Sequence, residues 1–93
     1  MIKVAKIVEI APYYIVCDFN NGVKKRLEIL PLIESQEKFR GIELLKEKEI
    51  FESASIGIMG EVFWKDIITI KNELWNYDIS PEFIFYNGTT VIE

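Results

Sequence analysis

The chain has 93 residues, of which 49% are apolar and 28% are charged, and its formal net charge is -4. This length and apolar fraction predict a single domain, residues 1–93, and exclude both a disordered chain and two separate cores. Because it has no His and one Cys, the chain also lacks the residues for a histidine base, a histidine metal site, an internal disulfide or a thiolate metal cage.

The distribution of charge predicts a cytoplasmic protein that does not associate with a membrane. Charged residues interrupt every short apolar run near the N-terminus, so the sequence predicts neither a signal peptide nor a membrane helix. The single Cys17 fits a reducing compartment. The acidic balance argues against non-specific binding of nucleic acid, which needs a basic surface.

Three antiparallel strands are predicted in the first third of the chain. Apolar and polar residues alternate in the segments Ile2–Ile10, Tyr13–Phe19 and Val23–Ile29. Pairing Ile10 with Tyr13, and therefore Val8 with Ile15, keeps the apolar side chains of the first two strands on one face.

The turn between the second and third strands is predicted to have three residues, Asn20-Asn21-Gly22. This length pairs Ile15 with Leu27 and sets Asp18 opposite Lys24, whereas a two-residue turn mixes apolar and charged faces. Glycine at the last turn position supplies the left-handed residue of a type I turn with a bulge.

The middle of the chain changes to helical periodicity. Pro31–Gln36 predicts one short turn of helix. Between Lys38 and Lys46, an apolar stripe of Phe39, Ile42 and Leu45 predicts a second helix packed on the core.

The last third returns to strands, predicted at 54–58, Glu61–Ile70 and Leu74–Tyr77. The long middle strand is apolar on both faces, with one face formed by Val62, Trp64, Ile68 and Ile70 and the other by Phe63 and Ile67. A turn at Lys71-Asn72 or Asn72-Glu73 joins it to the next strand.

A short helix is predicted near the C-terminus. Ser80 is a favoured N-cap and Pro81 fits the first helical position, while Asn87-Gly88 predicts the helix end. The tail Thr89–Glu93 either pairs as an edge strand or frays. The sequence therefore predicts an α+β fold, in which an antiparallel sheet of five or six strands (an N-terminal three-stranded meander and a later hairpin) carries two or three short helices on one face.

Several short motifs follow one another in a distinctive order: the hairpin Tyr14–Gly22, the segment Leu30–Ile33, Leu45 with Phe51, and the ending Trp75–Glu82. This order resembles the small bacterial protein family called domain of unknown function 2442, over roughly Ile2 to Gly88. Glu61–Leu74 is longer than the last hairpin of that family, and Trp64 and Trp75 both compete for its tryptophan position.

The resemblance implies a small α+β fold and no known reaction. Members resemble stand-alone proteins that are often encoded beside another small protein, as in toxin–antitoxin pairs, which suggests a co-encoded partner. Some relatives add a helix-turn-helix segment, for which this chain has no room, so direct reading of DNA is not expected.

Catalytic chemistry finds little support in the sequence. Without His, general acid–base catalysis would need paired carboxylates, for which the candidates are Asp66, Glu73, Asp78 and Glu82. Those at 78 and 82 are better explained by the start of a helix. Cys17 lies mid-strand on the core face and is expected to be buried, and no loop has the spacing of a calcium or phosphate site. We therefore expect no catalytic residue, no cofactor and no metal.

Aromatic residues concentrate in the last third of the chain. Neighbouring residues on a strand point to opposite faces, so Phe63 and Trp64 cannot both enter one core. Partners often bury exposed Trp and Tyr as anchors. The leading hypothesis is a non-enzymatic protein-interaction module or homodimer that uses Trp75, Tyr77 and one of Phe63 or Trp64.

The alternative hypothesis is a nucleic-acid-linked regulator without its own helix-turn-helix. It would use the basic cluster Lys24, Lys25 and Arg26, which is otherwise explained as solvent-facing strand residues. Base stacking on the aromatic residues is a weaker version, because acidic surroundings oppose the phosphates.

Overall fold

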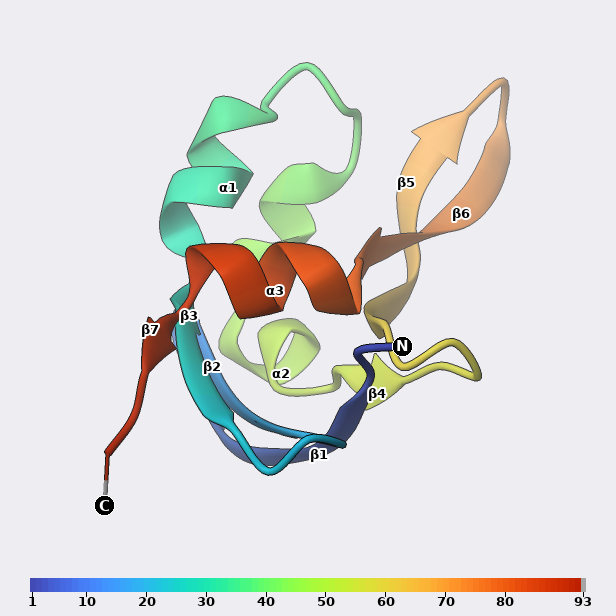
Figure 1. Cartoon of the computed structure of the whole chain (residues 1–93). Helices are drawn as coiled ribbons and strands as arrows, with labels where there is room; N and C mark the ends of the chain where they lie inside the picture. Colours follow the sequence, from blue (N-terminus) through green and yellow to red (C-terminus); the bar gives the residue numbers. More distant parts are fainter. Residues whose placement is uncertain (93) are drawn as a thin grey trace.

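The computed structural model describes residues 1–92 and contains two antiparallel sheets (Figure 1). The first sheet has the order β1-β2-β3-β7 and the second has the order β4-β5-β6. The strands are β1 (Val4–Ala11), β2 (Tyr14–Phe19), β3 (Lys24–Glu28), β4 (Ser55–Ile56), β5 (Val62–Ile70), β6 (Glu73–Ile79) and β7 (Thr89–Thr90). The α+β class is confirmed. The single sheet of five or six strands is wrong, because the helical segment after β3 separates two sheets of four and three strands.

The register between β2 and β3 is the predicted one. Ile15 pairs with Leu27 and Asp18 with Lys24, whose side chains form an ion pair at 3.8 Å. Gly22 has a φ of 86°, the left-handed conformation that the three-residue turn requires. Side-chain alternation alone was enough to determine this register.

The predicted register between β1 and β2 is wrong. Ile10 pairs with Ile15, not with Tyr13, because the two-residue turn is Pro12-Tyr13, one residue later in the chain than the predicted pairing requires. Two irregularities farther along β1 change which residues face inward: Ile7 packs against the core, while Val8 lines a groove on the outer face. A bulge shifts the alternation of a strand by one residue without any strong sequence signal.

The segment between the sheets folds into α1 (Leu30–Ser35), the 3-10 helix η1 (Ile42–Lys46) and α2 (Lys48–Phe51). The helical turn near Pro31 is confirmed, but the predicted helix from Lys38 begins only at Ile42. Gly41, with a φ of 104°, precedes it in the left-handed region and prevents an earlier start. Phe39 consequently lies outside the core, contrary to the predicted apolar stripe.

The C-terminal segment follows the sequence prediction closely. Ser80 caps α3 (Pro81–Asn87), and its hydroxyl accepts a hydrogen bond from the Phe83 N–H at 3.1 Å. The strand predicted at 54–58 is shorter, since only Ser55–Ile56 pairs with β5. In the tail, Thr89 and Thr90 pair with β3, and the last residue of the predicted edge strand, Glu93, lies outside the described residues.

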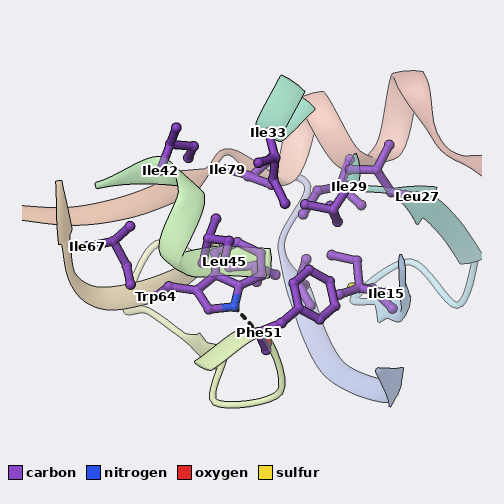
Figure 2. Close-up of a cluster of buried hydrophobic side chains, with 14 of the residues drawn as sticks. Ile15, Leu27, Ile29, Ile33, Ile42, Leu45, Phe51, Trp64, Ile67 and Ile79 are labelled. Carbon is purple, nitrogen blue, oxygen red and sulfur yellow. Dashed lines mark hydrogen bonds between the residues drawn. The ribbon is translucent and has the colours of Figure 1, made fainter. Parts of the chain in front are cut away.

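The core lies where the inner faces of the two sheets meet the helices (Figure 2). It is built from aliphatic side chains around two large rings, Phe51 and Trp64, neither of which is exposed to solvent. Among residues 1–92, no helix is long and apolar enough to cross a membrane.

Candidate functional site

The β5–β6 hairpin extends away from the rest of the molecule (Figure 1). Its turn is Lys71-Asn72, as one of the two predictions had it, with φ angles of 49° and 65°. Ile70 and Glu73 pair directly across the turn. Two successive left-handed residues are typical of the two-residue turns that match the twist of a hairpin.

A bulge divides the hairpin into an inner and an outer half. Three residues of β5, 65–67, lie opposite the single Asn76 of β6. Asp66 adopts a φ of 54°, and its backbone N–H donates to the Asn76 side-chain oxygen at 3.1 Å. As a result both Ile67 and Ile68 are buried, although the sequence placed them on opposite faces.

The inner half belongs to the core. Trp64 has 0% of its surface exposed, and its indole N–H donates to the Phe51 carbonyl at 2.7 Å (Figure 2). Its ring lies 5.7 Å from the Phe51 ring and 5.9 Å from the Tyr77 ring, measured between centroids. Trp64 is therefore not available to a partner, which corrects its place among the predicted contact residues.

The same apolar face continues along the outer half, where the rest of the chain does not cover it. Trp75, which pairs with Ile68, is 53% exposed, and Ile70 and Phe39 are 48% and 42% exposed. Together with Tyr77 these residues line a groove of about 370 Å³. We call Phe39, Ile70, Trp75 and Tyr77 the hairpin surface.

Tyr77 joins the hairpin to the end of α1. Its hydroxyl donates to the side-chain oxygen of Gln36 at 2.6 Å. Burial raises the pKa of Tyr77, and the nearby charge of Asp78 raises it further. A second groove, of about 170 Å³, is lined by Tyr77, Gln36 and Phe83, so the hydrogen bond lies where the two grooves meet.

The structure brings together only two of the four predicted contact residues, Trp75 and Tyr77. Phe63 is half-buried and pairs with Asp78 and with Ser55 of β4, away from the hairpin surface. The sequence reasoning missed Ile70 and Phe39. Ile70 had been placed on the correct face, but nothing in the sequence indicated that this face extends beyond the body of the protein.

The basic cluster Lys24, Lys25 and Arg26 is not one surface. Lys24 pairs with Asp18, and Arg26 donates to Glu28 at 2.7 Å and lies over the ring of Tyr14. Lys25 points to the other side of the sheet, where its ammonium donates to Thr90 at 2.8 Å and lies 4.8 Å from the Phe85 ring centroid. Each cation is thus engaged within the molecule.

Two of the four acidic candidates lie near each other. Asp78 and Glu82 line a groove of about 300 Å³ with Glu61, whose carboxylate accepts a hydrogen bond from the Met59 N–H at 3.0 Å. In the part of the chain that the structure describes, no three acidic or cysteine side chains are placed to hold a metal ion.

Cys17 lies on the core face of β2, as expected. Its side chain is fully buried, and burial raises the pKa of its thiol to about 12. Its thiolate, the reactive form of a cysteine, is strongly disfavoured at neutral pH.

Comparison with protein-family models, with curated proteins and with solved structures finds no match for this chain. The hairpin surface must therefore be interpreted from its own geometry.

Proposed function

We propose that this protein is a non-enzymatic, cytoplasmic interaction module that binds a protein partner, such as a co-encoded one, through the hairpin surface. The observation that supports this proposal best is the half-exposed Trp75. It lies on the same face of the hairpin as the packed rings of Trp64 and Tyr77, beyond the point where the rest of the chain covers that face. Trp and Tyr are enriched among the residues that contribute most to binding.

The composition of the hairpin surface also suits a partner. It combines aliphatic and aromatic side chains around a groove that the polar residues Gln36, Asn76 and Asp78 also line. An apolar centre with a polar rim is the usual anatomy of a protein interface. The nucleic-acid alternative lacks comparable support, because its three cations lie on two faces of the sheet and have partners within the chain.

Affinity capture from a lysate of the source organism tests this proposal. The tagged protein is compared with Trp75→Ala and with Tyr86→Ala, which removes an exposed aromatic ring outside the groove. We expect one stoichiometric protein that survives nuclease treatment, is lost with Trp75→Ala and is retained with Tyr86→Ala.

The opposite results are equally informative. If Trp75→Ala retains every captured protein, the hairpin surface is not the contact. If nucleic acid is captured instead and is lost at moderate salt, the result supports the regulator hypothesis and contradicts the interaction module.

A further inference from the structure

The sheet edges in residues 1–92 differ in how they are protected. Two irregularities interrupt β1, and its Val4 N–H donates to the Gly60 carbonyl at 3.1 Å, while β4 and β7 have only two residues each. Beyond β4, the edge of β5 is covered by the loop before η1, since the Thr69 N–H donates to the Arg40 carbonyl at 2.9 Å. Natural proteins protect open edges in these ways because an open edge pairs with other strands.

The outer edge of β6 has no such protection. Within residues 1–92, β5 is the only element in extensive contact with β6, and no backbone–backbone hydrogen bond joins β6 to a residue outside the β5 ladder. The strand is seven residues long and contains no Pro, Lys or Arg. It also carries the exposed side chains of Leu74 and Trp75 on its two faces.

We propose that β6 pairs with β6 of a second copy of this chain, antiparallel and centred on Asn76, so that two three-stranded sheets become one. The proposal rests on the proposed function, since it brings a second copy against Trp75 and Tyr77 of the hairpin surface. This register is the one in which all seven residues of the strand, Glu73–Ile79, find a partner.

The side chains of β6 are complementary to themselves in this register. Trp75 lies opposite the partner's Tyr77, and the two-fold symmetry makes this aromatic pair twice. Glu73 lies opposite the partner's Ile79, and Asp78 lies opposite the partner's Leu74. No carboxylate therefore faces another across the ladder, although the strand carries two of them.

The ends of the strands are complementary in charge. Lys71 is in the hairpin turn of one copy and would extend past the end of the partner's β6. There it reaches the start of α3, where Glu82 lies in the first turn. A strand of another protein would need its own matching aromatic and charged residues, whereas a second copy of this chain already has them.

Sedimentation velocity over a range of protein concentrations tests whether the dimer forms. Variants that change the charge at position 74, opposite the partner's Asp78, test its register. Leu74 is 60% exposed and faces away from Trp64, so substitutions there leave the core intact. Leu74→Glu places like charges opposite each other at two symmetric sites, whereas Leu74→Lys places opposite charges there. The double variant Leu74→Glu with Asp78→Lys restores an opposite-charge pair.

We expect the wild type to form a dimer whose fraction rises with concentration. Leu74→Glu should raise its dissociation constant on the order of tenfold, Leu74→Lys should not, and the double variant should recover the dimer. A monomer at all concentrations overturns the strand pairing, and so do equal effects of Leu74→Glu and Leu74→Lys. The proposed function is tested separately, by the capture experiment with Trp75→Ala.

Discussion

Two hairpins of this protein, β2–β3 and β5–β6, differ in how much of their apolar face is covered. In the β2–β3 hairpin, Ile15, Cys17 and Leu27 are all buried in the core. In the β5–β6 hairpin, the same kind of face begins with the buried Trp64 and ends with the half-exposed Trp75. Both tryptophans lie on one face, so the position along the hairpin decides which of them is core.

The difference follows from strand length. The strands of the first hairpin have six and five residues, and those of the second have nine and seven. A nine-residue strand spans up to about 30 Å, and a six-residue strand about 20 Å. The outer half of the second hairpin therefore reaches beyond the body of the protein (Figure 1).

The largest expected effect contrasts the two tryptophans. Trp64→Ala should lower the free energy of unfolding by about 3–5 kcal/mol, because it leaves a cavity and removes the hydrogen bond to Phe51. Trp75→Ala should change it by less than about 1 kcal/mol, because half of that side chain is already in water. Urea denaturation measures both values. Similar losses for the two variants would remove the distinction between an inner and an outer half.

The next effect concerns the two glycines near these hairpins. A Cβ at Gly41 would lie 1.9 Å from the Ile67 carbonyl oxygen, whereas a Cβ at Gly22 would meet no atom within 4 Å. Gly41→Ala should therefore cost more than about 2 kcal/mol, and Gly22→Ala only the backbone strain of about 1 kcal/mol. Thermal unfolding of the two variants is the measurement. Equal melting temperatures would mean that the loop does not pack on the β5 edge.

The third prediction tests how well the β2–β3 hairpin keeps water away from the thiol of Cys17. The pKa of the Cys17 thiol is raised from 9.0 to about 12 in the folded protein. As the pH rises from 9 to 12, unfolded chains lose this proton while folded chains keep it, so stability falls by up to about 1.4 kcal/mol per pH unit.

The control for this effect is Cys17→Ala, which has no thiol to titrate. Urea unfolding at a series of pH values should give a shallower alkaline decline for the variant than for the wild type. Parallel declines would show that the thiol is not protected by burial.

The smallest effect concerns the contact between the second hairpin and the end of α1. Tyr77→Phe removes the hydrogen bond to Gln36 and should cost about 0.5–1.5 kcal/mol. Tyr86→Phe, at an exposed hydroxyl on α3, should cost nothing measurable and serves as its control. If Tyr77→Phe is also silent, Tyr77 does not hold the hairpin against the body.

The sequence was sufficient where side-chain alternation and turn chemistry act locally. The β2–β3 register and the Ser80 cap follow from such patterns, and the turn after β5 was narrowed to two positions, of which Lys71-Asn72 is the observed one. It failed at the β1 irregularities and at the β5 bulge, where Asp66 adopts a left-handed conformation that few side chains favour. Such features depend on packing across the molecule.

For the candidate site, the sequence identified Trp75 and Tyr77 but could not separate Trp64 from Trp75. Both have apolar neighbours on their strands, and only the extent of the body decides which is covered. Phe39 was missed because its spacing with Ile42 and Leu45 fits a helix that Gly41 interrupts. The free edge of β6 depends on the order of strands, which the predicted single sheet did not contain.

The outer half of the β5–β6 hairpin is proposed to be a contact surface at which the edge of β6 pairs with β6 of a second copy. Amide hydrogen exchange of Glu73–Ile79, measured on dilute and on concentrated protein, tests it most directly. We expect the amides that do not bond to β5 to exchange rapidly in dilute protein and to become protected as the concentration rises. Rapid exchange at every concentration, with protection of β5 unchanged, would contradict the claim.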